Sequence, residues 1–206
     1  GTNFTNVISK EGSNIWRVYC NDTVNNVNSS SVTVEREWLS TNVTMCRTLD
    51  TAGTYILRND VNSDGTCFTI EADDVVLDGN GKNINSSAGN TIVVSGARNN
   101  VTIKNAEIIN SDTYSGIVFT GNAINSTINN LTINAGIDSC DDAVYGCSGI
   151  MFSSSSSSNV ITNSVITVSN SGSNSAGICF RDTSSSDKIT GNEINTHSIS
   201  VWYFEP

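Results

Sequence analysis

Residues 60–71 place oxygen-bearing side chains at the spacing of a calcium-binding loop. The segment reads DVNSDGTCFTIE, which follows the EF-hand pattern D-x-[DN]-x-[DN]-G-x5-E. An EF-hand needs a helix on each side, whereas the flanks TYIL and CFTIE are strand-like. If the second half of the segment is extended, at about 3.3 Å per residue, Glu71 lies too far from Asp60 to share an ion. We therefore expect a turn here, with a weak calcium site on Asp60, Asn62 and Asp64 left open.

The other residue types suited to catalysis form no recognisable constellation. Adjacent carboxylates occur at 73–74 and 141–142, but neighbours on a strand point to opposite faces, so adjacency does not pair them. The single histidine, His197, stands alone in NTHSIS and is expected at the surface rather than as an acid or base. Arg98 and Arg181 sit in no recognisable motif, and nucleophile and phosphate-binding motifs are absent from the sequence. The sequence therefore predicts neither an enzyme nor a bound cofactor.

Cysteines and glycosylation sequons together indicate a secreted protein. The chain has six cysteines in no zinc-site spacing: Cys20, Cys46, Cys67, Cys140, Cys147 and Cys179. An even number of cysteines fits disulfides formed in an oxidising compartment, and scattered buried thiols are the alternative. N-x-[ST] sequons begin at Asn3, Asn21, Asn28, Asn42, Asn85, Asn100, Asn125 and Asn130. We expect an extracellular or cell-surface protein that carries covalent N-glycans.

Composition excludes several classes of partner. The net charge is -10, and only 15% of the residues are charged, so the chain could not neutralise a nucleic-acid backbone or an acidic membrane. No apolar run approaches 18 residues, so we expect no membrane insertion. Polar content comes mainly from Asn, Ser and Thr, which compete with the backbone for hydrogen bonds and disfavour long helices. These features favour a chain rich in strands and turns.

Two short motifs alternate along the second half of the chain. The motif G-I-x-F occurs at 116–119, 149–152 and 177–180, with weaker copies at 91–94 and 200–203. Between its copies lies I-x-N-x-x-I, which occurs at 103–108, 128–133 and 161–166, and at 189–194 with glycine in the Asn position. The irregular period, well under a propeller blade, and the alternation of apolar residues indicate short strands separated by turns.

The repeats predict a right-handed parallel β-helix. Each repeat would form one coil, and equivalent strands would stack about 4.8 Å apart. The stack would then bury the inward apolar side chains, which no single coil can bury alone. The expected fold class is all-β, with about five to six coils over residues 41–206.

Residues 46–84 resemble the opening of the parallel β-helix repeat proteins of archaeal and bacterial surfaces. Later coils, such as NNVTIKNAEIINS and STINNLTINAG, are similar to that family too, and the resemblance covers roughly residues 44–203. The fold also carries pectate lyases, polygalacturonases, tail spikes and inert stalks, so it does not imply one function. The resemblance implies a disulfide between Cys46 and Cys67, which bracket the first coil. Cys140 and Cys147 are expected to close a small loop by a second one.

The N-terminal part has a different character. Residues 15–37, IWRVYCNDTVNNVNSSSVTVERE, resemble the last strands of an immunoglobulin-like sandwich module. Trp16 and Val18 alternate along one expected strand, residues 32–34 lie on the next, and FTNVI before them would give a third. A complete sandwich needs about seven strands. We therefore expect residues 1–40 to pack on the β-helix or to be completed by strands of a neighbouring subunit.

One position of the repeat predicts an asparagine ladder. Asn105, Asn130 and Asn163 occupy the same column, where asparagine tolerates a left-handed backbone and where stacked amides can bond to one another. The alternative is a row of plain exposed turn residues. An internal ladder conflicts with a glycan, so Asn130 is the least suitable of the sequons.

A second column predicts an apolar stripe on the outside of the stack. If Ile and Phe of G-I-x-F point inward, the residue between them points outward. This column contains Val93, Val118, Met151, Cys179 and Trp202. A stripe of this kind would be covered by the N-terminal strands or by another subunit, and a misassigned side-chain direction is the alternative. Cys20 has no partner on an earlier strand, so it is free, pairs with Cys179 or pairs between chains.

These expectations favour a structural role over a catalytic one. We expect a subunit of a surface fibril or surface layer that forms homo-oligomers or filaments through strand complementation or end-to-end stacking. The last coil ends in VWYFEP without a visible cap, in keeping with stacking. The alternative is a carbohydrate-active β-helix, either a lyase, a hydrolase or a glycan-binding module, and a surface adhesin comes third.

Overall fold

The structure is a computed structural model that describes residues 12–21, 23–36, 41–111, 114–136, 148–169, 175–197 and 199–203. These residues form strands and turns, so the predicted all-β class is confirmed, and no helix long and apolar enough to cross a membrane is found among them. The chain divides into two compact units, Gly1–Leu39 and Ser40–Pro206.

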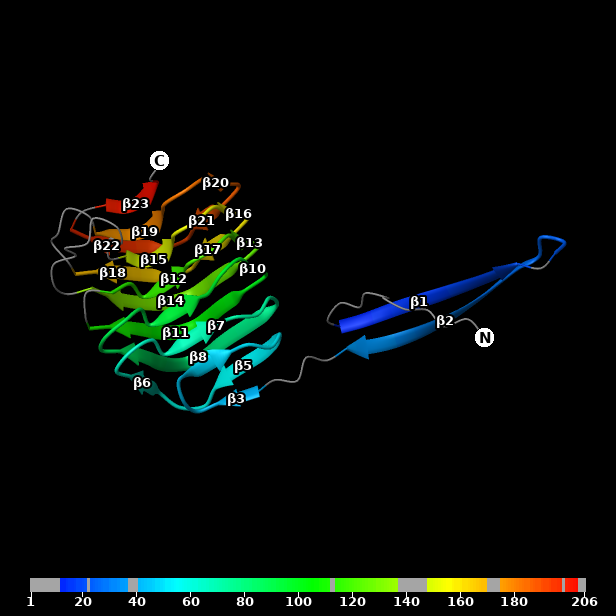
Figure 1. The fold of residues 1–206 in the computed structure, drawn as a ribbon, viewed down its shortest axis with the longest axis horizontal. Helices are drawn as coiled ribbons and strands as arrows, with labels where there is room; N and C mark the ends of the chain where they lie inside the picture. Colours follow the sequence, from blue (N-terminus) through cyan, green and yellow to red (C-terminus); the bar gives the residue numbers. More distant parts are fainter. Residues whose placement is uncertain are drawn as a thin grey trace. The chain divides into compact units, whose positions relative to one another are not determined.

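The first unit contains an antiparallel hairpin (Figure 1). Strand β1 (Gly12–Asn21) pairs along its whole length with β2 (Val27–Arg36), with Gly12 opposite Arg36 and Asn21 opposite Val27. The third strand expected at FTNVI lies outside the described residues. The described part of this unit is therefore a two-stranded sheet and not a sandwich.

The second unit is a parallel β-solenoid of about five turns, and its described residues form three sheets (Figure 1). The seven-stranded sheet contains β4 (Arg47–Leu49), β7 (Phe68–Ile70), β9 (Ile92–Val94), β12 (Ile117–Phe119), β15 (Ser148–Phe152), β19 (Ala176–Phe180) and β23 (Ile199–Tyr203). The ten-stranded sheet contains β3 (Thr41–Val43), β5 (Gly53–Leu57), β6 (Val61–Ser63), β8 (Val75–Ser86), β11 (Thr102–Asn110), β14 (Thr127–Ala135), β17 (Val160–Thr162), β18 (Val165–Val168), β21 (Lys188–Thr190) and β22 (Glu193–Thr196). The small sheet contains β10 (Arg98–Asn99), β13 (Ala123–Ile124), β16 (Ser156–Ser157) and β20 (Ser184–Ser185).

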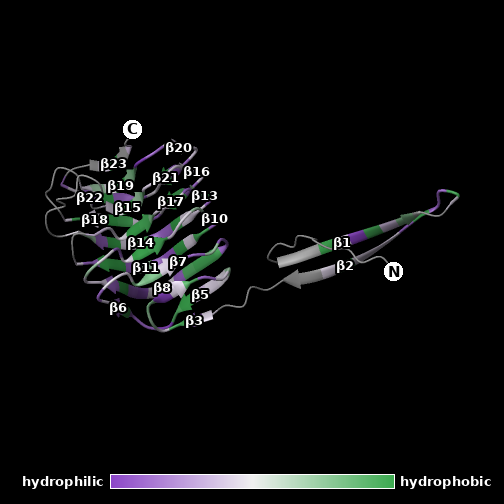
Figure 2. Cartoon of the chain, viewed as in Figure 1, coloured by the Kyte–Doolittle hydropathy of each residue, from purple (hydrophilic) through white to green (hydrophobic). Residues whose placement is uncertain are grey.

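The repeats stack in the register that the motifs predict. In G-I-x-F, Ile117 pairs with Ile150 and Ile150 with Ile178, while Ile128 of the second motif pairs with Ile161. All of these side chains are buried in one continuous core that runs through the stack, and Figure 2 shows apolar segments recurring in successive coils. The stack, rather than any single coil, creates the core, because each coil alone would leave its upper and lower faces in water.

The last position of G-I-x-F forms an aromatic column inside the core. Phe119 stacks on Phe152 with ring centroids 4.6 Å apart, and Phe152 stacks on Phe180 at 4.9 Å. Tyr203 continues the column at 4.9 Å from Phe180, but its side chain is 55% exposed in the last described coil. Parallel in-register strands place identical side chains one strand spacing apart, so the stacking follows directly from the repeat.

The glycine of G-I-x-F is required by close packing between sheets. A Cβ atom on Gly149 would lie 2.3 Å from Cγ2 of Ile166 and 2.8 Å from the Gly177 carbonyl oxygen. The equivalent glycines, Gly116 and Gly177, meet the same kinds of neighbour at similar distances. The motif therefore begins with glycine because a side chain there has no room, and not because the backbone needs a left-handed conformation.

Candidate functional site

The segment that matches a calcium loop is part of the solenoid wall. Residues 61–63 form β6, which pairs with the second half of β8, and no helix flanks it. Each candidate ligand contacts the next coil: Asp60 Oδ1 accepts a hydrogen bond from the Asn83 amide at 2.9 Å, and Asn62 Oδ1 accepts one from Asn85 Nδ2 at 2.6 Å. The side-chain oxygens of Asp60 and Asn62 are thus engaged by the next coil.

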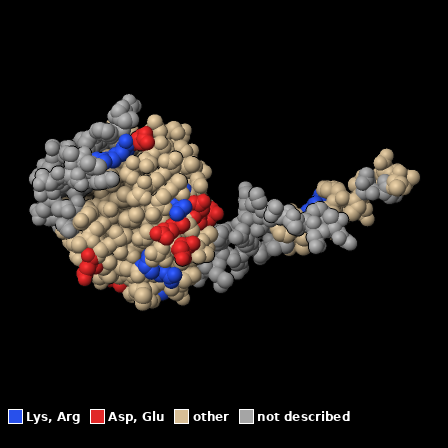
Figure 3. Space-filling model, in the orientation of Figure 1, with Lys and Arg blue, Asp and Glu red and all other residues tan. Residues whose placement is uncertain are grey.

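Metal-ligating side chains do not gather elsewhere in the described residues either. Among them, no group of three or more His, Cys, Asp or Glu side chains could hold a metal ion. Asp73 Oδ1 accepts a bond from the Asn99 amide at 3.0 Å, and Asp74 Oδ1 accepts one from Asn100 Nδ2 at 2.7 Å. This pair therefore bonds to the next coil, and the second pair, 141–142, lies outside the described residues. Figure 3 shows a small acidic group on a face that is otherwise mostly uncharged.

Asp78 is the carboxylate that its surroundings perturb. Its Oδ2 lies 3.3 Å from Lys104 Nζ, and its Oδ1 accepts bonds from Asn105 Nδ2 at 3.1 Å and from the Asn80 amide at 2.9 Å. Partial burial favours the neutral acid, but the hydrogen bonds and the lysine outweigh it and hold the pKa of Asp78 below its ordinary value. The group joins β8 to β11 and has the chemistry of a structural ion pair.

The predicted asparagine column lies at a left-handed turn. Asn105, Asn130 and Asn163 have φ values of 55°, 52° and 52°, and Gly191, which takes the same place in the last repeat, has 67°. Asn130 Nδ2 donates to Asn105 Oδ1 at 2.8 Å, so stacked amides do bond between coils. The column differs from an internal ladder in one respect, because Asn130 and Asn163 are exposed. It stabilises a turn at the surface rather than in the core.

A second left-handed column was missed by sequence reasoning. Asp74, Asn100, Asn125, Ser158 and Ser186 have φ values from 53° to 61° and stack at the turn that ends the small sheet. In the sequence, Asn100 and Asn125 are recognisable only as the start of sequons. The signal was weak because the column mixes three residue types, whereas the first column is nearly uniform.

Next to that turn, polar side chains of one coil cap the backbone of another. Asn159 Oδ1 accepts a bond from the Ser126 amide at 2.8 Å, and Asp187 Oδ1 accepts one from the Asn159 amide at 2.8 Å. Asp187 Oδ2 also accepts bonds from the hydroxyls of Ser156 and Ser184, each at 2.6 Å. Buried amides at a solenoid turn need such partners because they lie away from water. Asp187 is thus fully engaged in supporting the turn.

The predicted apolar stripe on the outside of the stack is buried at three of its positions. Val118, Met151 and Cys179 do point away from the main core, since they form a separate cluster with Ala176. They are, however, only 2–4% exposed, so an open apolar surface does not exist at these positions. Val93, in the same column, is half-buried, and the side chain of Trp202 lies outside what the structure describes.

The cysteines divide into a bonded pair and two thiols. Cys46 and Cys67 form the predicted disulfide, which links the residues just before β4 to those just before β7. Cys20 is free and exposed on β1, and Cys179 is free and buried on β19, so the structure contains no bond between them. Burial raises the pKa of the Cys179 thiol, and the neighbouring Arg181 offsets part of that rise. Cys140 and Cys147 lie outside the described residues.

The sequons differ in whether the amide nitrogen, to which a glycan attaches, already donates a hydrogen bond. Such bonds engage three of them: Asn85, Asn100 and Asn130. Asn28 and Asn42 are exposed, and their side-chain oxygens accept bonds from the Ser29 amide and from Arg58 Nε. Asn125 is exposed at its turn. Asn3 and the side chain of Asn21 are not described.

His197, Arg98 and Arg181 lie at separate points along the described chain. His197 is exposed after β22, in the last described coil. Arg98 Nη1 donates to the Ala97 carbonyl at 3.0 Å, within its own turn. Arg181 lies beside Cys179. Arg98 lies in β10, Arg181 follows β19 and His197 follows β22, so these three residues lie on different elements of the solenoid.

The hairpin is the part of the described chain with the most exposed apolar surface. Trp16, Val18 and Val32 project from one face, because Trp16 pairs with Val32 and strand residues alternate. Val18 and Val32 are 41% and 54% exposed, and Ile15 and Tyr19 on the other face are 67% and 63% exposed. A two-stranded hairpin is marginally stable in water, so a sheet of this composition needs a partner surface.

Comparisons with protein-family models, with curated proteins and with solved structures find no match for this chain. The resemblance seen in the sequence is supported by the strand arrangement at the level of a parallel β-solenoid fold, and no family is identified.

Proposed function

We propose that this chain is an extracellular, N-glycosylated structural subunit of a surface fibril or surface layer. The solenoid serves as a rigid body, and the hairpin β1–β2 joins it to a second copy by accepting or donating strands. The observation that carries this proposal is the exposed apolar face of the hairpin, which contains Trp16, Val18 and Val32.

The hairpin favours strand complementation for two physical reasons. Among the described strands, β1 and β2 pair only with each other, so the backbone groups on their outer edges can pair with a further strand, and ten paired residues provide a template for it. A third and fourth strand would also cover the face of Trp16, Val18 and Val32, because neighbouring strands and an opposing sheet pack over such a face. Joining two copies therefore satisfies backbone and side chains together.

The polar side chains of the solenoid support a structural role because they bond between coils. Asp60, Asn62, Asp74, Asp78 and Asp187 each bond to a neighbouring coil or to a lysine on it. Such groups hold the stack together, and a catalytic group needs instead to face a substrate. The disulfide and the exposed sequons support the extracellular compartment.

A matched pair of variants tests the proposal. Val32→Asp places a charge on the apolar face, and Thr33→Asp places the same charge on the opposite face, one residue along β2. We expect the native chain and Thr33→Asp to form oligomers or filaments in sedimentation and negative-stain microscopy, and Val32→Asp to remain dispersed. Equal behaviour of the two variants would contradict a role for this face. Monomeric native protein that degrades acidic polysaccharides would favour the carbohydrate-active alternative.

A further inference from the structure

The first coil ends the seven-stranded sheet at a short edge strand. Strand β4 pairs with β7 on one side and has no neighbour among the described strands on the other. The Arg47 amide donates to the Cys67 carbonyl and the Leu49 carbonyl accepts from the Glu71 amide, each at 2.9 Å. Because successive residues of a strand direct their backbone groups to opposite sides, Thr48 directs both its N–H and its C=O toward the open edge. An edge of this kind is a template for another strand.

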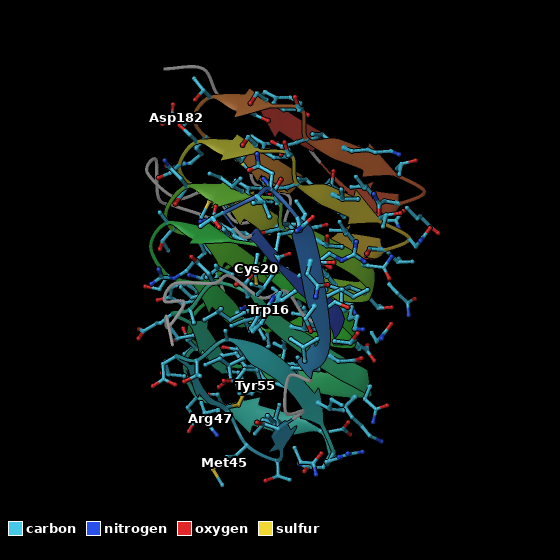
Figure 4. The ribbon with its side chains drawn as sticks, turned by 90° about the vertical axis from the view of Figure 1, so that its right-hand side faces the viewer. Trp16, Cys20, Met45, Arg47, Tyr55 and Asp182 are labelled. Carbon is cyan, nitrogen blue, oxygen red and sulfur yellow. A yellow bond between two sulfur atoms is a disulfide. The ribbon has the colours of Figure 1, made fainter. Side chains whose placement is uncertain are left out.

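The side chain of Arg47 occupies part of that edge. Its Nε donates to the Thr48 carbonyl at 3.2 Å, which is the acceptor that an incoming strand would need. Figure 4 shows Arg47 at the first-coil end of the solenoid, near the disulfide. A three-residue edge strand offers one outward acceptor, and Arg47 takes it.

Arg47 also places a charge at the end of a core column. It pairs with Phe68, and Phe68 pairs with Ile92, so all three share one side of the sheet. Phe68 and Ile92 are fully buried, whereas Arg47, on the edge strand of the described sheet, is exposed. A coil added at this end would bury the guanidinium against Phe68 without a carboxylate partner, and an unpaired buried charge is strongly unfavourable.

We propose that Arg47 blocks the first-coil end of the solenoid against edge-to-edge pairing with a β-strand of a second copy. Inward-pointing charges and short strands are known means of protecting sheet edges. The block gives assembly a direction, because contacts between copies must then use other surfaces. This inference goes beyond the proposed hairpin contact and concerns a different part of the chain.

The test uses the full chain with Val32→Asp as the parent, so that association through the hairpin face is weakened. Arg47→Val is compared with Arg58→Val, because Arg58 is also an exposed arginine of the first coil. Arg58 Nε bonds to the side chain of Asn42 at 2.7 Å and not to an outward backbone carbonyl. Arg47→Ala is measured in parallel, since it removes the same bond and charge with a smaller side chain. Sedimentation velocity over a range of concentrations reports association, and circular dichroism reports folding.

We expect Arg47→Val and Arg47→Ala to associate at least about tenfold more tightly than the parent, while Arg58→Val sediments like the parent. Amide hydrogen exchange at Thr48 should slow in the associated Arg47 variants, because the new strand pairs with that amide. The inference is overturned if folded Arg47 variants sediment like the parent, if Arg58→Val associates equally, or if Thr48 exchange is unchanged on association. Failure of the hairpin proposal appears separately, as a native chain whose association Val32→Asp does not alter.

Discussion

Gly149 offers a stringent test of how the repeat packs. It lies in β15, between the core column of Ile166 and the backbone of the next coil. In Gly149→Ala, the new Cβ would lie 2.3 Å from Ile166 Cγ2 and 2.8 Å from the Gly177 carbonyl oxygen. Two carbon atoms pack at about 3.5 to 4.0 Å, so the first contact is more than roughly 1 Å too short.

The loss of folding free energy in Gly149→Ala depends on how far the atoms around the new Cβ can shift. Overpacking of a core costs typically about 1–3 kcal/mol, and the upper part of that range applies because one neighbour is a backbone carbonyl in a paired strand. Each kcal/mol shifts the melting midpoint by about 2–4 °C in a domain of this size. We therefore expect Gly149→Ala to lower the midpoint by roughly 6–12 °C.

The assay is thermal unfolding followed by far-ultraviolet circular dichroism, with Gly65→Ala as the matched control. A Cβ on Gly65 meets the Ala88 carbonyl oxygen at 3.5 Å, which is ordinary contact. We expect this control to stay within about 0.5 kcal/mol of the native chain. Ile166→Ala removes one of the two clashing groups, so the double variant with Gly149→Ala should lose less stability than the sum of the single variants. A Gly149→Ala midpoint equal to that of Gly65→Ala would refute the packing argument.

Three further predictions concern polar groups and the disulfide. Asn130→Ala should lose roughly 1–2 kcal/mol in denaturant unfolding and Asn130→Gly less, because φ is 52° and alanine resists the left-handed region. Equal losses would show that the turn conformation is not the cause. The pKa of Asp78 is lower in the folded state, so its stabilisation is present above the unfolded pKa and is lost as pH falls through the folded pKa. Asp78→Asn should therefore show a weaker acid dependence of its melting midpoint than the native chain, and parallel curves would contradict this. Replacing Cys46 and Cys67 by serine removes a loop constraint across a sequence separation of 21 and should cost about 3 kcal/mol, measured under oxidising conditions. An unchanged midpoint would argue against this contribution.

The repeat motifs predicted the solenoid because the same physical rule acts on every coil. Apolar residues two positions apart share one face of a strand, and their recurrence at every coil aligns Ile117, Ile150 and Ile178 in one column. The Cys46–Cys67 disulfide came from the resemblance and is confirmed.

The direction and the burial of side chains outside the main core were harder to predict from the sequence. Val118 does face away from the main core, as the alternation requires, but its burial depends on what packs over the sheet. The left-handed turn that contains Asn100, Asn125 and Ser158 could not be recognised from one residue type, because asparagine, aspartate and serine all occupy it. These features depend on contacts between distant segments.

The sequence by itself determined the strand pattern, the stacking register and the left-handed asparagine column, because these follow from local residue types repeated at each coil. Only the tertiary structure decided which polar groups bond between coils and that Arg47 lies on an edge strand, where it bonds to an outward carbonyl. Asp60, Asn62 and Asp64 match the pattern of a calcium loop in the sequence. In the structure, however, the side-chain oxygens of Asp60 and Asn62 accept hydrogen bonds from the neighbouring strand β8. The role of Arg47 likewise depends on its position in the fold. In a middle coil the same residue would have to be buried, whereas on the edge strand it donates a hydrogen bond to the outward carbonyl of Thr48.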